Sequence, residues 1–183
     1  MRNLVKSLLR LNLALLLVAA PLAAQKLAPP SPEIQQAMQS AVEKYKAGDL
    51  PGAIAILEPV RKEPGTHPAA LSLLGTLYLE ADRPKDAFAV LGPIADGELA
   101  GPVILHNAAR AALAIGETEK AEAYLRRAVA KAPDSPAARD LGVVLGSDGK
   151  IAESYELLRP WALAHKDDAD ARLSAAFDAI ELQ

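Results

Sequence analysis

The chain has 183 residues, no cysteine, 4% aromatic residues and a formal net charge of −3 at pH 7. The absence of cysteine excludes disulfides, thiolate catalysis, thiolate metal sites and lipid attachment to a cysteine. The acidic balance argues against a nucleic-acid-binding protein, because such proteins usually carry a basic stripe. Alanine and leucine, both strong helix formers, are abundant and favour a helix-rich fold.

Residues 1–24 have the three-part layout of a secretory signal peptide. Basic residues stand near the start, residues 11–20 are almost entirely apolar, and small residues follow. We expect cleavage after Ala24, which leaves 17 basic residues against 23 acidic ones. The product would be periplasmic or secreted, with no strong attraction to anionic membrane surfaces. The alternative is a retained inner-membrane anchor, although the apolar run is shorter than the roughly 20 residues of a membrane span.

The part of the chain after the leader reads as one helical domain. Residues 25–32 hold three prolines and no hydrophobic periodicity, which predicts an extended linker. Over residues 33–183, segments of helical length alternate with short turns rich in glycine, proline and aspartate. No run alternates apolar and polar residues as a strand would, so we predict an all-α domain.

A repeat of about 34 residues organises this domain. A small residue recurs in register at Ala53, Ala87, Ala121 and Ser154. Four positions later stand the leucines Leu57, Leu91, Leu125 and Leu158. Five positions earlier stand the turn residues Gly48, Asp82, Gly116 and Gly149, and twelve positions earlier the small residues Ala41, Gly75, Ala109 and Gly142. We expect helical hairpins whose helices cross closely at the small residues and whose stacking buries a continuous core.

The pattern resembles the tetratricopeptide repeat. The second unit matches that motif at Leu71, Leu74, Gly75, Tyr78, Ala87 and Leu91. The first unit departs from it, with Ser40 in place of the leucine and Lys44 in place of the tyrosine. The resemblance implies a solenoid of four helix-turn-helix units, at about residues 34–67, 68–101, 102–134 and 135–167, that binds protein or peptide partners.

The second helices carry an unusual residue. Three of the four units have a proline at one equivalent position, at Pro59, Pro93 and Pro160, and the remaining unit has Arg127. A proline inside a helix removes a backbone hydrogen bond, so each of these helices is expected either to kink or to end early.

Residues 168–182 predict a final helix. Leu173, Ala176, Phe177 and Ile180 form one apolar stripe along it. A solenoid needs a cover for the open face of its last repeat, so we interpret the helix as a cap that packs through this stripe. The alternative is that the stripe docks on a second copy of the protein.

Patterns of enzyme and metal sites are missing from the sequence. His67, His106 and His165 are too far apart for a helical zinc motif. The glycines near Lys150 do not have phosphate-loop spacing, and no nucleophile-elbow motif occurs. We therefore expect no catalytic residues, no metal and no cofactor.

The resemblance implies that the first helices line a groove for a partner. The candidate groove residues are Tyr45, Leu73, Thr76, His106, Asn107, Arg110, Arg139 and Asp140. Asn107 and Arg110 are about one helical turn apart, so together they could hold a peptide backbone or a carboxylate. A full carboxylate clamp is not expected, because Ser72, Leu73 and Val103 stand where further lysine and asparagine residues would be needed. The alternative is an ordinary polar patch on the helix surface.

The predicted function is a non-enzymatic adaptor or scaffold of the bacterial cell envelope. The alternative is a structural subunit that self-associates, or joins a larger complex, through its helical ends. An uncleaved leader would tether either one to the membrane.

Overall fold

The computed structural model describes residues 29–62 and 67–182, and this part of the chain is built of α-helices without a strand. Its helices are α2 (Pro32–Lys46), α3 (Leu50–Arg61), α4 (Pro68–Glu80), α5 (Pro84–Ala95), α6 (Pro102–Ala114), α7 (Thr118–Lys131), α8 (Pro136–Ser147), α9 (Ile151–Ala164) and α10 (Ala169–Glu181). None of them is long and apolar enough to cross a membrane. The predicted leader at residues 1–24 lies outside the described residues.

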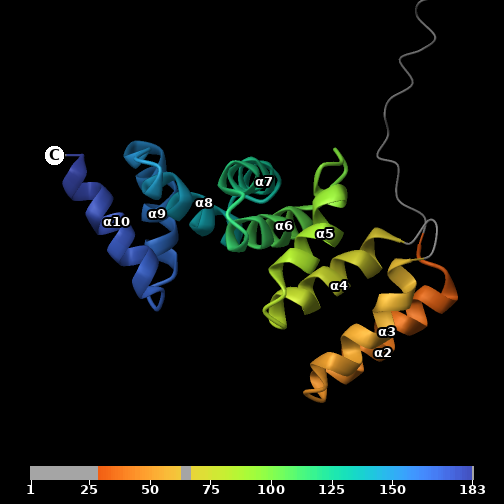
Figure 1. Cartoon of the computed structure of the whole chain (residues 1–183). Helices are drawn as coiled ribbons and strands as arrows, with labels where there is room; N and C mark the ends of the chain where they lie inside the picture. Colours follow the sequence, from red (N-terminus) through yellow and green to blue (C-terminus); the bar gives the residue numbers. More distant parts are fainter. Residues whose placement is uncertain (1–28, 63–66, 183) are drawn as a thin grey trace, which may run out of the picture.

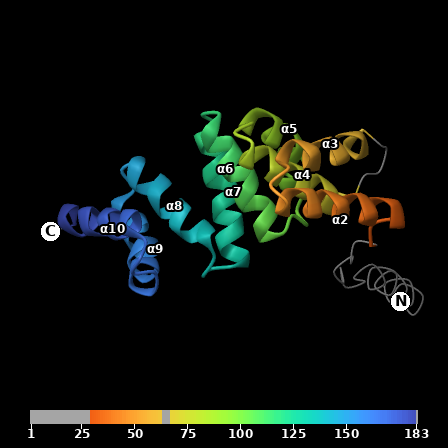
Figure 2. The same ribbon diagram turned by 90° about the horizontal axis from the view of Figure 1, so that it is seen from below.

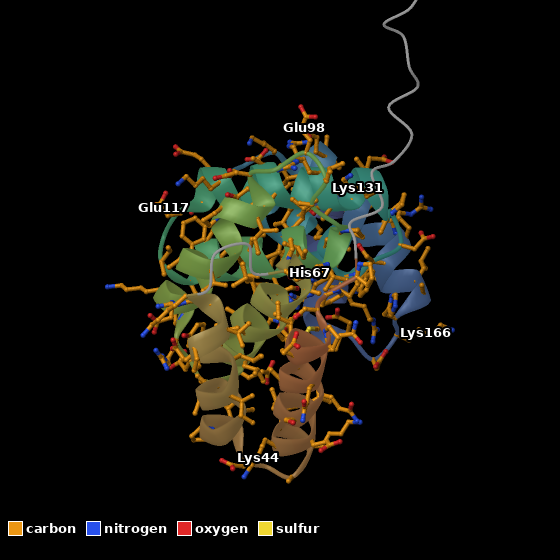
Figure 3. The ribbon with its side chains drawn as sticks, turned by 90° about the vertical axis from the view of Figure 1, so that its right-hand side faces the viewer. Lys44, His67, Glu98, Glu117, Lys131 and Lys166 are labelled. Carbon is orange, nitrogen blue, oxygen red and sulfur yellow. The ribbon has the colours of Figure 1, made fainter. Side chains whose placement is uncertain are left out.

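The helices form four hairpins stacked in a row, followed by α10 (Figures 1 and 2). The hairpins are α2–α3, α4–α5, α6–α7 and α8–α9, and successive hairpins meet through α3 with α4, α5 with α6 and α7 with α8. α10 packs on α9 and touches α8. Charged side chains such as Lys44, Glu98 and Glu117 lie at the periphery (Figure 3). The all-α solenoid predicted from the repeat is confirmed.

Each hairpin turns at the residue that the repeat marks. The turn glycines adopt left-handed backbone conformations, with φ of 82° at Gly48, 83° at Gly116 and 74° at Gly149. Asp82 occupies the same place in the second unit with φ of 53°. Glycine and, less easily, aspartate adopt positive φ, which explains the choice of these residues.

The small residues of the repeat let the two helices of a hairpin approach closely. Ala53, Ala87 and Ala121 are fully buried. A Cβ atom added to Gly142 would lie 2.6 Å from Leu158 Cγ, and one added to Gly75 would overlap the side chain of Leu91. In these two hairpins a leucine of the second helix therefore fills the space that glycine leaves on the first helix.

The three repeated prolines lie inside the second helices. α3 and α5 end two residues after their prolines and have 12 residues each, whereas α7, without a proline, has 14. α9 also has 14 residues and continues for four residues beyond its proline. Of the three helices with a proline, α3 and α5 therefore end early and α9 does not. The three prolines and the residues four positions before them are exposed, so water can reach each carbonyl that lacks its helical donor.

Arg127 replaces the proline in α7 and connects two neighbouring units. Its guanidinium donates hydrogen bonds to the carbonyl oxygens of Ala95 and Gly97, the latter at 2.6 Å. Because α5 ends at Ala95, the carbonyl of Ala95 is at a helix end, where the last carbonyls lack donors within the helix. The departure from proline in the third unit thus supplies an inter-unit contact.

The apolar stripe of α10 does not pack as predicted. Leu173, Phe177 and Ile180 are 59%, 60% and 63% exposed, and Ala176 is exposed as well. The buried residues of α10 are Ala171, Ala175 and Asp178. Ala175 follows Gly142 by 33 residues, so α10 packs through the small-residue face that the repeat gives to a first helix. α10 covers the last hairpin as predicted, but the prediction that it packs through the stripe is wrong, because the repeat register and not local hydrophobicity sets the buried face.

Candidate functional site

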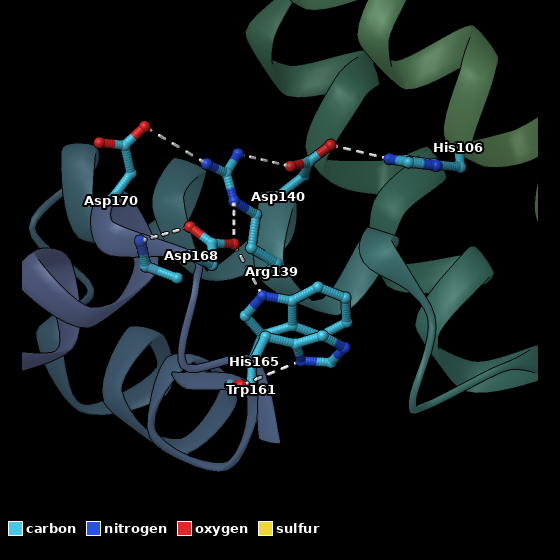
Figure 4. A network of polar contacts seen from close by, with 8 residues as sticks. His106, Arg139, Asp140, Trp161, His165, Asp168 and Asp170 are labelled. Atoms are coloured by element: carbon cyan, nitrogen blue, oxygen red, sulfur yellow. Dashed lines mark hydrogen bonds and ion pairs between the residues drawn. The ribbon is translucent and has the colours of Figure 1, made fainter. Parts of the chain in front are cut away.

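A chain of polar contacts joins the first helices of successive units. We call it the polar ladder and define it as Thr76, Asn107, His106, Asp140, Arg139 and Asp168. It runs from α4 through α6 and α8 to the residue before α10. Figure 4 shows the part from His106 onward. Five of these residues are groove residues predicted from the sequence, so the structure brings most of the candidate site together.

The first contact of the ladder joins α4 to α6. Asn107 Nδ2 donates a hydrogen bond of 3.0 Å to Thr76 Oγ1, and the threonine hydroxyl donates to the carbonyl of Ser72 at 2.9 Å. Asn107 is only 9% exposed, so the prediction of an exposed groove asparagine is wrong. A buried amide needs a hydrogen-bond partner. Thr76 in the neighbouring unit provides one, so the burial of Asn107 is tolerated. Asn107 therefore joins units together and does not offer its amide to solvent.

The second contact joins α6 to α8. His106 Nε2 donates to Asp140 Oδ2 at 2.7 Å, and Arg139 donates to Asp140 Oδ1 at 3.0 Å. Burial alone would raise the pKa of Asp140, but the hydrogen bonds from His106 and Arg139 outweigh it and leave that pKa below its ordinary value. Asp140 is thus held as a carboxylate between two donors.

The third contact brings the start of α10 to α8 and α9. Arg139 Nε lies 3.4 Å from Asp168 Oδ2, and Trp161 Nε1 donates to the same oxygen at 2.9 Å. The other carboxylate oxygen of Asp168 accepts the backbone N–H of Ala171 at 3.0 Å and caps α10. The hydrogen bond from the backbone of Ala171 and the one from the indole of Trp161 both lower the pKa of Asp168. The indole of Trp161 is in turn stacked on His165, with ring centroids 3.7 Å apart.

Asp168 and Trp161 belong to this site, although the sequence pattern does not indicate it. The spacing of seven residues between them spans the turn that connects α9 to α10, so no helical periodicity relates the two. An N-cap aspartate followed by a helix was the available signal, and it predicts the cap but not the indole contact.

The remaining groove residues lie beside the ladder or away from it. Arg110 is exposed on α6, one turn beyond His106, and it forms no hydrogen bond or ion pair with other described residues. Tyr45 is 44% exposed near the end of α2. Leu73 is half-buried and packs against the core. Of these three, Arg110 therefore offers the clearest polar group to a partner.

An open hollow adjoins the ladder at Trp161. It has a volume of about 370 Å³ and lies where α7, α8 and α9 meet. Its walls are mostly apolar and include Val129, Pro133, Ala138, Leu157, Trp161 and His165. The hollow is large enough for an apolar side chain of a partner, and Trp161 connects it to the charged groups of the ladder.

Stacked helical hairpins with small residues at their crossings and left-handed turns define a tetratricopeptide-type solenoid. The family model described as "Tetratricopeptide repeat" matches residues 102–145, which span α6, α7 and most of α8. The chain therefore carries a tetratricopeptide repeat there, and its described part has the corresponding fold, as the resemblance implied.

Solved structures share this fold. The chain is similar to the MamA protein, with a TM-score of 0.70, 23% identity and 80% of each chain covered. It is similar to a tetratricopeptide repeat protein of Parabacteroides merdae ATCC 43184, with a TM-score of 0.66, 22% identity, and 80% of this chain and 59% of the other covered. YrrB, described as "a TPR protein with an unusual peptide-binding site", gives a TM-score of 0.69 at 16% identity, with 79% of this chain and 75% of that chain covered. No curated protein matches the sequence.

Proposed function

We propose that the protein is a non-enzymatic scaffold of the bacterial cell envelope that binds a protein or peptide segment on a surface comprising Arg110 of α6 and the hollow between α7, α8 and α9. The observation that carries this proposal is the hollow beside the polar ladder. It places an apolar receptacle next to charged groups that neighbouring residues already hold in position. Groups fixed before binding lose little freedom when a ligand arrives, which favours recognition of a partner.

The chemistry of the face suggests what a partner segment carries. An apolar side chain fits the hollow at Trp161 and Leu157. Arg110, exposed on α6, suits a carboxylate or a backbone carbonyl of the partner, because a guanidinium is a donor that always carries charge. The similarity to YrrB adds support, because YrrB has the same fold and is described as having a peptide-binding site.

Capture experiments with matched variants test the binding face. Immobilised protein is exposed to an envelope extract, and the retained proteins are quantified by mass spectrometry. Ala164→Trp places an indole in the hollow from an exposed position, and Ala123→Trp adds the same group on an exposed part of α7 outside the hollow. Arg110→Ala is paired with Arg159→Ala on exposed α9. We expect Ala164→Trp and Arg110→Ala to reduce retention of the same partner several-fold while their controls retain it. Equal retention by all four variants would refute this binding face.

The envelope location is part of the proposal and is supported by the signal-peptide layout of residues 1–24. Fractionation of cells and N-terminal sequencing of the purified protein test it. We expect the protein in the periplasmic or secreted fraction with an N-terminus near Gln25. A cytoplasmic protein that retains Met1 would contradict it.

A further inference from the structure

The hollow beside the polar ladder continues into a second one along the same two helices. The second hollow has a volume of about 500 Å³ and also lies between α7, α8 and α9. The two hollows share Val129, Glu156 and Leu157, so they form one depression, which we call the α7–α9 groove. Ala138 and Leu141 of α8 line it as well. The groove therefore offers a longer apolar surface than the hollow at the ladder alone.

Acidic groups outnumber basic ones along this groove. Glu153, Glu156 and Asp134 are among its lining residues, and Arg126 lines it on the opposite helix. Arg126 is already paired with Glu153 at 2.8 Å and with Glu122 at 2.8 Å. Glu156 and Asp134 are exposed and form no hydrogen bond or ion pair with other described residues. Two carboxylates of the groove are therefore open to a cationic group of a partner.

Two further basic side chains lie nearby but do not neutralise these carboxylates. Arg159 follows Glu156 by three residues on α9, but it lines neither hollow of the groove and is not ion-paired with Glu156. His165 lines the groove, but its ring is stacked on Trp161 and its Nδ1 lies 3.1 Å from the carbonyl oxygen of Trp161. Charge complementarity therefore favours a partner that brings lysine or arginine.

The proline of α9 adds another acceptor to the groove. Pro160 has no N–H, so the carbonyl oxygen of Glu156, four residues earlier, lacks its helical donor. Both residues line the groove and are exposed. Lysine and arginine side chains carry several N–H donors and no acceptor, so one such side chain can bond the carboxylate of Glu156 and this carbonyl together.

The length and polarity of the groove favour a helix over an extended segment. α9 lines it from Ala152 to Ala164, which corresponds to a rise of about 18 Å and to a partner helix of about 12 residues. A helix satisfies its own backbone N–H and C=O groups. An extended segment would need backbone partners that mostly apolar walls do not supply.

We propose that the α7–α9 groove binds an amphipathic helix of a partner protein. The apolar face of that helix packs on Val129, Leu157 and Trp161, and a lysine or arginine beside this face contacts Glu156. An acidic helix would instead place like charges together. The inference rests on the proposed function, because it specifies the partner segment that occupies the same hollow.

A pair of synthetic helical peptides tests this preference on the full chain. One peptide consists of leucine, alanine and lysine, with leucines along one face and lysines beside them, and the other has glutamate in place of every lysine. Trp161 is the single tryptophan of the chain and lines the groove, so its fluorescence reports binding there. We expect the lysine peptide to protect Trp161 from quenching by acrylamide and to bind several-fold more tightly than the glutamate peptide.

Variants separate a specific contact from the overall acidity of the protein. Binding is measured by the fluorescence anisotropy of labelled peptide, and circular dichroism establishes that each variant is folded. Glu156→Lys should weaken binding of the lysine peptide several-fold and strengthen binding of the glutamate peptide. Glu98→Lys makes the same charge change at an exposed residue outside the groove and should leave both affinities within about two-fold. Ala164→Trp, which places an indole in the hollow, should abolish binding of the lysine peptide.

Three results would overturn the inference. Equal effects of Glu156→Lys and Glu98→Lys would show that only net charge matters. A glutamate peptide that binds as tightly as the lysine peptide would refute the charge preference, yet the proposed binding surface would stand if Ala164→Trp still blocked that peptide. A lysine peptide that leaves Trp161 unprotected would refute a helix in the groove, while the capture experiment decides separately on the proposed function.

Discussion

Ser154 and Asp178 meet in the interior of the molecule at the junction of α9 and α10. Ser154 Oγ lies 2.5 Å from Asp178 Oδ2 and 2.8 Å from the carbonyl oxygen of Gly142, and both side chains are buried. The other three units have alanine at the position of Ser154. Gly146 makes room for the pair, since a Cβ added there would lie 3.0 Å from Ser154 Oγ. The serine is thus the specific partner that fixes α10 to the last hairpin.

Removal of the serine hydroxyl should loosen α10. Ser154→Ala leaves the carboxylate of Asp178 buried without this partner, which costs about 1–3 kcal/mol. Amide hydrogen exchange should show faster exchange in α10 than in α6. Ser147→Ala, which removes an exposed hydroxyl on α8, serves as the control. Ser154→Ala combined with Asp178→Leu should recover most of the protection, because both polar groups are then absent. Unchanged exchange in Ser154→Ala would contradict the role of the pair.

Arg127 should contribute more to stability than its neighbour Arg126. Arg127 bonds two carbonyls at the end of α5, whereas Arg126 forms exposed ion pairs with Glu122 and Glu153. We expect Arg127→Ala to lower the free energy of unfolding by about 1–3 kcal/mol and Arg126→Ala by less than about 1 kcal/mol. Urea denaturation followed by circular dichroism measures both. Equal losses would show that the contact with α5 adds nothing.

Close packing between α4 and α5 makes Gly75 sensitive to the smallest substitution. Gly75→Ala should lower the free energy of unfolding by about 1–3 kcal/mol, because the new methyl group overlaps Leu91 in a packed core. Gly101→Ala is the matched control, since a Cβ there meets no atom within 4 Å. We expect the control to be neutral within about 0.5 kcal/mol, and Gly75→Ala with Leu91→Val to regain part of the loss. Thermal unfolding of the natural protein and the three variants measures these differences in stability.

Acid should weaken the contact between α6 and α8 through Asp140. The pKa of this carboxyl is lower in the folded protein than its ordinary value of 3.8. Such a group stabilises the fold above its unfolded pKa, and this contribution is lost as the pH falls from about 3.8 through the folded pKa. Asp140→Asn should be less stable than the natural protein at pH 7, and the difference should shrink below about pH 3.8. Urea titrations between pH 2 and pH 7 measure it, and parallel curves would refute the role of Asp140.

The sequence predicts the repeat well because the repeat depends on local geometry. The turn residues and the crossing residues stand at fixed positions, and a left-handed turn or a close helix contact accepts few residue types. Gly48, Gly116 and Gly149 have positive φ, and Gly75 faces Leu91. Helical spacing also placed His106, Arg139 and Asp140 on related faces of the first helices.

The rest depends on contacts between units, which spacing alone does not determine. Asn107 is buried because Thr76 in another unit satisfies its amide. The side chains of α10 show a conflict between two patterns, since the apolar stripe suggests one buried face and the register that places Ala175 after Gly142 gives another. The register determines the packing because it sets how closely α10 can approach its neighbours. A comparison of these two patterns in the sequence would have identified the exposed stripe.

Each helix in the described part of the chain touches chiefly the helices before and after it, as Figure 1 illustrates. A force that pulls on α2 and α10 would therefore meet a series of separate junctions and no single continuous brace. Small rotations at every junction would add up along the row, so we expect the molecule to lengthen before any one hairpin opens. Two partners bound at its ends would therefore be connected by an extensible element and not by a rigid one.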